Sequence, residues 1–308
     1  MIDLIIDCDP GQDDSIAILL ALANKNFNIL GITTVAGNVT AQQTFLNAKK
    51  MCICANRSEV QVYKGAEKPI KKELKTAEHI HGENGLSCDI LVEDDSELRP
   101  NAIQFIIETL EKSDRKITIA ATAALTNLAL AFNKAPHIKE KIDQIVIMGG
   151  STEGGNITKY AEFNFFTDPH AADIVFRSGV KIVMIGLNIT HQVVFSESEI
   201  TKIKHINNVV TNQAVKILED LLITNRDVYG HKGGIVHDAC VIAYLSDPNI
   251  FSSKEAYVCI ETKNQENVGQ SYVDYSSNIN NSLVCIDVDI ERIFSLFLKL
   301  FSHYNANN

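Results

Sequence analysis

Short apolar runs alternate with longer amphipathic stretches along most of the chain. Residues 2–8 (IDLIIDC) form an apolar run that ends in acidic residues, which is typical of a buried parallel strand. Residues 13–24 then show a helical pattern with two aspartates at the start, where the helix dipole favours negative charge. Residues 28–35 predict the next strand and residues 40–56 the next helix.

The alternation continues through the rest of the sequence. Further strands are predicted at 60–64, 116–122, 143–148 and 180–185, and further helices at 101–112, 126–133, 168–178 and 237–246. More helices are predicted within 196–228, late strands near 256–261, 270–275 and 283–288, and a closing helix at 289–303. Strands that alternate with helices predict an α/β fold with an open, mostly parallel central sheet and helices on both faces. The sequence has no Pro- or Gly-rich linker and no internal repeat, so we expect a single domain over residues 1–308.

Net charge, apolar runs and cysteine content indicate which partners the protein binds and where in the cell it lies. The net charge of −10 argues against nucleic-acid binding, which needs clustered Lys and Arg. The acidic N-terminal region does not resemble a secretory signal, and no run of 18 apolar residues predicts a membrane span. Seven cysteines without a C-x-x-C motif predict buried, reduced thiols. These features predict a cytoplasmic protein that binds a small molecule.

Four carboxylates lie within residues 7–14 (DCDPGQDD). Asp7 and Asp9 share one face of the predicted strand by its two-residue period, and Asp13 and Asp14 begin the following helix. Helix capping would explain the second pair but not the first. A hard divalent cation held by oxygen ligands explains all four. A phosphate cradle is not predicted, because neither glycine-rich phosphate motif is present.

Polar residues also follow three other predicted strands, at 36–38, 123–127 and 149–168. Ligands in sheets of this kind bind beyond the carboxyl ends of the strands. We therefore expect these segments and the acidic cluster to form one site.

The spacing D-x-D-x-G-x-D-D resembles the nucleoside hydrolase family, the inosine–uridine preferring nucleoside N-ribohydrolases. Further matches are Ala36-Gly37-Asn38, His81-Gly82-Glu83-Asn84-Gly85, Leu125-Thr126-Asn127, Met148-Gly149-Gly150, Asn156, Glu162-Phe163-Asn164, Asp168-Pro169 and Val236-His237-Asp238. The resemblance implies calcium-dependent hydrolysis of the N-glycosidic bond of ribonucleosides to ribose and free base, on an open α/β fold. It also implies a homodimer or a homotetramer. One departure is Ala239, where many relatives have Pro.

The resemblance also assigns roles to individual residues. Calcium would be bound by Asp9, Asp14, the backbone carbonyl of Thr126, and Asp238. The metal would activate a water molecule, and Asp9 would take a proton from it. Asp13 and Asn164 would hold the 2′- and 3′-hydroxyls, Asn156 and Glu162 the 5′-hydroxyl, and Asn38 would line the same pocket.

The leaving base requires a proton or a hydrogen bond, which a histidine supplies near neutral pH. His237 matches the position of the family's acid, and His81 and Tyr229 are the candidates for contacts with the base. The chain has no Trp, so it cannot sandwich a purine between indoles as the purine-specific branch does. The choice between the inosine–uridine and pyrimidine-preferring branches stays open.

Two alternatives were weighed against this interpretation. A magnesium phosphatase of the haloacid dehalogenase type also begins with a strand ending in D-x-D, but that pair is typically followed by Gly-Thr, whereas Pro10-Gly11 follows here. A non-catalytic nucleoside- or calcium-binding homologue is expected to lack Asp9, Asp14 or His237, and all three are present.

Overall fold

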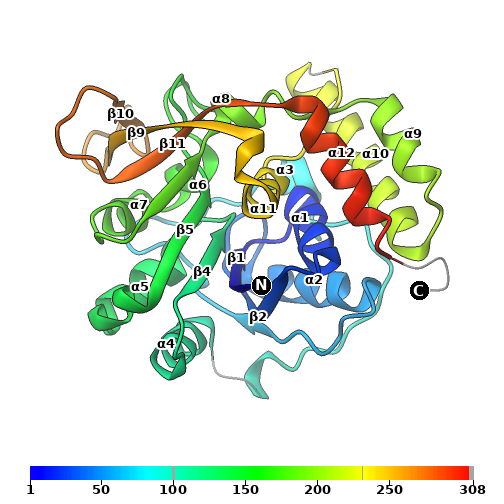
Figure 1. Cartoon of the computed structure of the whole chain (residues 1–308), viewed down its shortest axis with the longest axis horizontal. Helices are drawn as coiled ribbons and strands as arrows, with labels where there is room; N and C mark the ends of the chain where they lie inside the picture. Colours follow the sequence, from blue (N-terminus) through cyan, green and yellow to red (C-terminus); the bar gives the residue numbers. More distant parts are fainter. Residues whose placement is uncertain (99–100, 231, 305–308) are drawn as a thin grey trace.

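The computed structural model describes residues 1–98, 101–230 and 232–304. Within these ranges, the side chains of His79, His81, Leu98 and Tyr229 also lie outside the description. The predicted contacts of His81 and Tyr229 with a base therefore fall outside the described residues. The described part contains a nine-stranded sheet that lies between two layers of helices (Figure 1).

Six parallel strands form the centre of this sheet. They are β1 (Ile2–Cys8), β2 (Phe27–Thr34), β3 (Val62–Lys64), β4 (Ile117–Ala121), β5 (Ile142–Met148) and β6 (Ile182–Ile185). Their order is β3-β2-β1-β4-β5-β6. The chain thus places β2 and β3 on one side of β1 and β4 to β6 on the other, so the strand order reverses between β1 and β4. A reversal of this kind opens a crevice beyond the carboxyl ends of the two strands.

The late strands extend the sheet with a change of direction. β11 (Ser282–Val288) is parallel to β6, whereas β9 (Phe251–Ile260) is antiparallel to β11 and β10 (Ser271–Asp274) is antiparallel to β9. Figure 1 shows this edge projecting to one side of the molecule. The predicted α/β fold with a mostly parallel sheet is confirmed, although β9 begins earlier than the predicted strand at 256–261.

Two hydrophobic cores lie on opposite faces of the sheet. Along β1, Leu4, Ile6 and Cys8 belong to one core and Ile5 to the other, as the two-residue period requires. The first core is covered by α1 (Gln12–Ala23), α2 (Ala41–Cys54), α9 (Glu197–Lys204), α10 (Val209–Tyr229), α11 (Ala239–Ser246) and α12 (Ile290–Phe301). The second is covered by α4 (Ala102–Lys112), α5 (Thr126–Lys134) and α7 (Pro169–Phe176). The prediction of helices on both faces is therefore confirmed.

Several short elements have no counterpart in the sequence prediction. They are α3 (Glu78–His81), α6 (Phe163–Thr167), α8 (Leu187–Thr190), the paired strands β7 (Val194–Phe195) and β8 (Gly234–Ile235), and the 3₁₀ turns Ser96–Leu98, Pro136–Lys141 and Pro248–Ile250. Each is too short to show a periodic hydrophobic pattern. Among the described residues, no helix is both long enough and apolar enough to cross a membrane.

Helix α1 carries acidic residues into the interior. All of its residues are buried, because α2, α10, α11 and α12 pack around it. A helix surrounded in this way is apolar on all sides after its first turn. Asp13 and Asp14 lie in that first turn and are buried with the rest of the helix.

Candidate functional site

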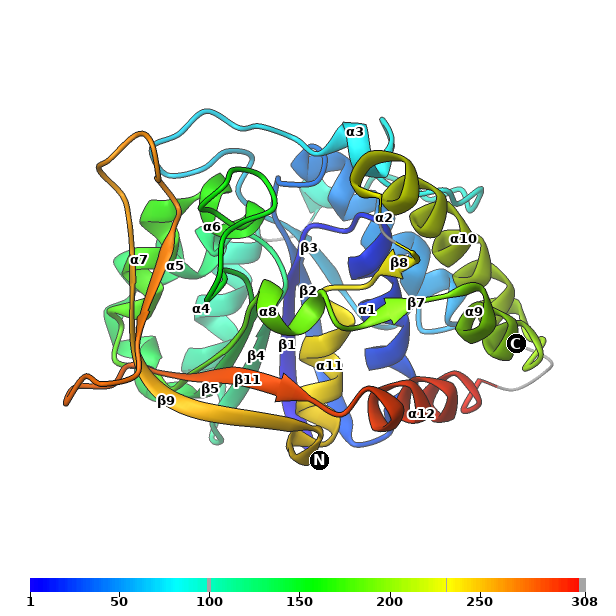
Figure 2. The ribbon, with the colours of Figure 1, turned by 90° about the horizontal axis from the view of Figure 1, so that it is seen from above.

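The candidate residues meet at the crevice beside β1 and β4. Asp9 follows β1 directly and Thr122 follows β4 directly. Figure 2 shows α3 at the top of the molecule and α6 and β8 on either side of β1. The crevice holds a cavity of about 290 Å³, which Asp9 and Thr122 both line.

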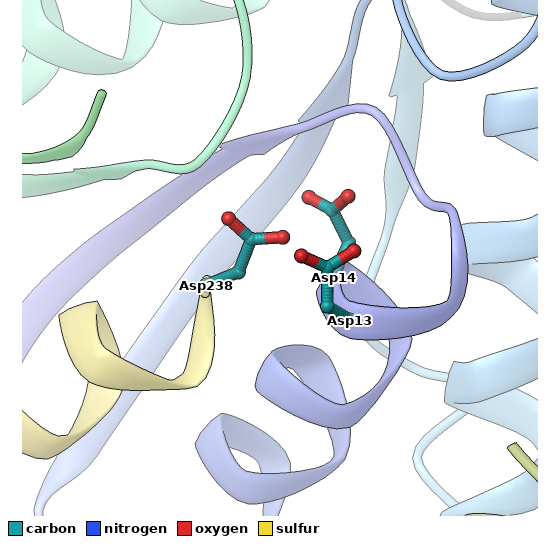
Figure 3. Close-up of side chains that lie close together, drawn as sticks. All are labelled: Asp13, Asp14 and Asp238. Atoms are coloured by element: carbon teal, nitrogen blue, oxygen red, sulfur yellow. The ribbon is translucent and has the colours of Figure 1, made fainter. Parts of the chain in front are cut away.

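Three buried carboxylates face one another at the cavity, which two of them, Asp13 and Asp238, line. Asp13 and Asp14 come from the start of α1, and Asp238 comes from the residue before α11 (Figure 3). Each of the three offers an oxygen that lies within 4.8 Å of an oxygen of each of the others. The structure therefore joins two predicted metal ligands, Asp14 and Asp238, to Asp13, which was predicted to hold the sugar.

Hydrogen bonds from three directions orient the Asp14 carboxylate. Thr122 Oγ1 donates to Asp14 Oδ1 at 2.8 Å, and Asn38 Nδ2 donates to Asp14 Oδ2 at 3.1 Å. The backbone N–H groups of Asp9 and Gly11 donate to the same carboxylate at 3.3 and 3.4 Å. These donors come from the ends of β2 and β4 and from the turn after β1, so the fold itself positions Asp14.

Asp9 lies beside this group but outside it. Its Oδ2 accepts the backbone N–H of Asn38 at 2.7 Å, whereas its buried Oδ1 has no hydrogen-bond partner among the described residues. Gly37 permits this approach, because a Cβ there would lie 2.0 Å from Asp9 Oδ2. One oxygen of Asp9 is therefore fixed by the backbone, and the other is left for a ligand.

Burial and mutual repulsion raise the pKa values of this cluster. Burial, followed by the charge of Asp14, raises the pKa of Asp9 well above its usual range. Burial and the charges of Asp13, Asp14 and Asp9 do the same to the pKa of Asp238. Burial also raises the pKa of Asp13, although a hydrogen bond with Asp238 opposes the shift. Buried carboxylates that repel one another are stabilised by a cation.

The donor set fits a hard divalent cation. Asp13 Oδ1, like Asp9 Oδ1, is buried without a hydrogen-bond partner in the described part of the chain. None of the described residues that line the cavity is Lys or Arg, so no side-chain ammonium or guanidinium group neutralises the cluster there. Carboxylate oxygens are the ligands that calcium and magnesium prefer.

Two residues of the predicted motifs do not line the cavity. Asp7 is outside the carboxylate group, because Thr33 Oγ1 and Asn127 Nδ2 donate to its Oδ1 at 2.6 and 2.8 Å. Burial raises the pKa of Asp7 to about 6, and these two hydrogen bonds limit the shift. Thr126 begins α5 and donates its hydroxyl to Asp168 at 2.8 Å, and it does not line the cavity. Thr122 does line it.

Asn164, Glu162 and Asn156 all line the cavity. Asn164 Nδ2 donates to the carbonyls of Thr122 and Met148 at 2.9 and 3.1 Å, which holds this side chain across the ends of β4 and β5. Asn156 Oδ1 accepts the backbone N–H of Phe163 at 2.9 Å.

Glu162 has a structural role of its own. Its carboxylate accepts the backbone N–H groups of Gly150, Asn164 and Phe165 at 2.9, 2.8 and 3.2 Å, so it caps the start of α6. Burial raises the pKa of Glu162 to about 7, although these three hydrogen bonds favour the charged form. The side chain is thus held rigidly at the cavity.

His237 lies between the carboxylates and two residues that the sequence did not single out. Thr190 Oγ1 lies 2.7 Å from His237 Nδ1, which fixes the plane of the imidazole ring. The ring of His191 lies edge to face with that of His237, at a centroid distance of 5.6 Å. Both histidines line the cavity. Thr190 and His191 follow a predicted strand by only a few residues, but α8, which places them, is too short to predict.

The remaining wall is largely apolar. Ala77 and Ile80 approach from the α3 segment, Leu221 from α10, and Ile235 from β8. Asn225 of α10 also lines this wall, and its Oδ1 accepts the backbone N–H of Ile235 at 3.3 Å. The cavity therefore combines a carboxylate and amide floor at the strand ends with an apolar wall, which suits a sugar that carries a flat base.

Comparisons with known proteins agree with this arrangement. The sequence pattern of the inosine-uridine preferring nucleoside hydrolase family matches residues 4–295. The chain is 39% identical over 306 residues to a pyrimidine-specific ribonucleoside hydrolase RihA of Photobacterium profundum, covering 98% of this chain and 99% of the relative.

Solved structures show the same fold. A plant nucleoside hydrolase, the PpNRh1 enzyme, superimposes with a TM-score of 0.92 at 28% identity, covering 97% of this chain and 98% of that one. A purine-preferring ribonucleoside hydrolase from Gardnerella vaginalis gives a TM-score of 0.91 at 30% identity, with the same coverage. The chain therefore belongs to the inosine-uridine preferring nucleoside hydrolase family and is a ribonucleoside hydrolase.

Proposed function

We propose that the chain is a calcium-dependent hydrolase that cleaves the N-glycosidic bond of pyrimidine ribonucleosides. The observation that carries the proposal is the cavity itself, where buried carboxylates and amides at the strand ends face an apolar wall. The family match opposes a phosphatase of another family, and the named hydrolase relatives together with Asp9, Asp14 and His237 oppose a non-catalytic homologue.

Asp14, Asp238 and Asp9 are the residues proposed to hold the calcium ion. A carboxylate oxygen of Asp14 lies within 4.8 Å of one of Asp238, and Asp9 Oδ1 has no hydrogen-bond partner among the described residues. Both observations support the proposal. The backbone carbonyl of Thr126 stays a proposed ligand. We also propose that Thr122 supports the set, because it follows β4 at the cavity and donates a hydrogen bond to Asp14. The chemistry that a bound calcium ion supplies at such a site is a lower pKa for a coordinated water.

The side chains of the floor stabilise a cationic sugar. Cleavage of an N-glycosidic bond develops positive charge on C1′ and O4′ of the ribose. Fixed carboxylates in a buried site stabilise that charge more strongly than water does. Asp9 is proposed to take the proton of the attacking water, since a buried carboxylate with a raised pKa is a stronger base than a surface carboxylate.

Asp13 and Asn164 are proposed to bind the 2′- and 3′-hydroxyls. Glu162 and Asn156 are proposed to bind the 5′-hydroxyl, and Asn38 to line the same pocket. All five line the cavity, and Asp13 Oδ1 has no partner among the described residues. Asn164 Nδ2 donates hydrogen bonds to two backbone carbonyls, so its Oδ1 remains as an acceptor for a hydroxyl.

His237 is proposed to protonate the leaving base. The contact with Thr190 at Nδ1 fixes the orientation of the ring at the cavity, which His237 lines. A hydroxyl partner suits an acid that changes charge, because it donates to a neutral imidazole and accepts from a protonated one.

Replacing His237 by Ala should slow uridine hydrolysis by ~10²-fold, because the base then leaves without a proton. A p-nitrophenyl riboside should slow far less, since its leaving group needs no proton. Steady-state kcat/KM for both substrates tests this, with exposed His205→Ala as the matched control. Equal slowing of both substrates would show that His237 shapes the site instead.

A pyrimidine preference is proposed from the relatives and from Asn225. The Photobacterium relative, whose name specifies pyrimidines, aligns over nearly the whole chain. Asn225 lines the cavity, and its Oδ1 is occupied by the N–H of Ile235. Its amide N–H groups are therefore the donors left for a carbonyl beside the glycosidic nitrogen, which uracil and cytosine both carry and hypoxanthine lacks.

We expect uridine to be hydrolysed with a kcat/KM at least ~10-fold higher than inosine, since a donor placed for a pyrimidine carbonyl is unpaired with a mismatched base. A panel of uridine, cytidine, inosine and guanosine assayed for released ribose measures the preference. Asn225→Leu should narrow it. A higher value for inosine would contradict the pyrimidine assignment and leave the hydrolase assignment intact.

The remaining proposals concern the setting of the enzyme. We propose a cytoplasmic protein, which is supported by seven cysteines that are all free. We also propose a single domain, supported by a sheet that joins strands from both ends of the chain. The homodimer or homotetramer that the resemblance implies stays a proposal.

A further inference from the structure

Asn47 connects two segments of the site without lining the cavity. It lies in the middle of α2 and is fully buried. Its Nδ2 donates to the carbonyl of Pro10 at 2.9 Å and to the carbonyl of Asn84 at 2.8 Å. Its Oδ1 accepts Gln43 Nε2 at 2.9 Å, so both halves of the amide are occupied and its orientation is fixed.

The Pro10 carbonyl belongs to the peptide unit that orients Asp14. The N–H of the same peptide unit is that of Gly11, which donates to Asp14 Oδ2 at 3.4 Å. A peptide unit is planar, so its carbonyl and its N–H rotate together. The hydrogen bond from Asn47 therefore fixes the donor that the peptide presents to the carboxylate cluster.

The Asn84 carbonyl belongs to the segment over the apolar side of the cavity. Ala77 and Ile80 of this segment line the cavity, and the backbone N–H of Ala77 donates to the carbonyl of Asn38 at 2.9 Å. The segment is thus attached at its start by Asn38 and near its end by Asn47. Gly85 packs directly on Asn47, since a Cβ there would lie 3.1 Å from Asn47 Nδ2.

We infer that Asn47 is a positioning residue that couples the segment over the base to the turn that orients Asp14. A single amide group makes both hydrogen bonds, so a displacement of either carbonyl moves the donor that serves the other. The coupling itself is a property of the fold, whereas its effect on turnover rests on the proposed function.

Amide hydrogen exchange tests the coupling directly. In Asn47→Ala, the two carbonyls lose their donor, and exchange should accelerate by ~10-fold both at residues 9–14 and at residues 77–85. Gln43→Ala is the control, because it removes only the partner of Oδ1. Acceleration in one segment alone, or in neither, would overturn the inference.

A second pair of variants leaves Asn47 in place. Gly85 and Gly82 both have positive φ angles, 72° and 77°, so an alanine strains the backbone at either position. An added Cβ meets Asn47 and Val39 at Gly85, but nothing within 4 Å at Gly82. Gly85→Ala should therefore accelerate exchange of the Gly11 amide, and Gly82→Ala should not. Equal effects of the two variants would refute the coupling.

Kinetics then shows whether the coupling serves substrate binding. Asn47→Ala should raise the KM for uridine by ~10-fold and change kcat less, since a loosened segment must be ordered when the base binds. A fall confined to kcat would contradict a role in placing the segment. If the wild-type enzyme did not hydrolyse nucleosides, the proposed function would fail, yet the exchange results would still decide the coupling.

Discussion

Asp9→Ala is expected to lower kcat/KM for uridine by ~10³-fold or more, because one side chain serves as proton acceptor and as a ligand of the proposed calcium ion. The structure supports both roles through the buried Oδ1 that has no partner among the described residues. Steady-state kinetics and a calcium-binding titration on the same protein measure the two losses separately. Calcium affinity should fall with activity.

The control for this variant is Asp143→Ala, which removes an exposed carboxylate at the start of β5 and should change neither quantity. Chelation of wild-type protein should abolish turnover, and added calcium should restore it. Near-normal activity of Asp9→Ala, or of protein shown to be free of metal, would contradict the proposed mechanism.

A substrate that lacks the 2′-hydroxyl should react ~10³-fold more slowly than uridine in kcat/KM. The floor of the cavity offers Asp13 and Asn164 to the sugar, and both are buried. A site built to bind a hydroxyl rejects an analogue without it, since its polar groups then stay unpaired. The glycosidic bond of a deoxynucleoside is intrinsically weaker, and this offsets part of the lost binding. We therefore expect a smaller factor than the ~10⁴-fold that sites built to bind a hydroxyl can reach.

The measurement compares uridine with 2′-deoxyuridine in the wild-type enzyme, in Asp13→Ala and in the control variant Asp143→Ala, which removes an exposed carboxylate. Asp13→Ala should reduce the ratio between uridine and 2′-deoxyuridine, because the variant no longer distinguishes the two sugars at this atom. Comparable rates for the two nucleosides in the wild-type enzyme would show that Asp13 and Asn164 do not hold the 2′-hydroxyl.

The sheet and the acidic end of the first strand were predictable from local pattern. A strand buried on both faces is an uninterrupted apolar run, so β1 and the following helix α1 stand out in the sequence. The turn between them carries charges that solvation alone does not explain. The family motifs added Asp238, which no local pattern connects to Asp14.

Other parts depended on tertiary contacts that no local signal reports. Thr122 was counted as the last residue of a predicted strand, but β4 ends one residue earlier and leaves its side chain at the cavity. Asn47 has the pattern of an ordinary helix position, and only its two distant carbonyl partners reveal its role. The reversal of β9 could not be predicted either, since an apolar run does not specify strand direction.

The carboxylate cluster forms only between distant parts of the chain. Asp13 and Asp14 lie near its beginning, whereas Asp238 follows all six strands β1 to β6. In an unfolded chain, water weakens the repulsion between these carboxylates. The unfavourable contact with Asp238 therefore arises only when α11 packs beside α1, and its electrostatic cost falls on the folded state alone.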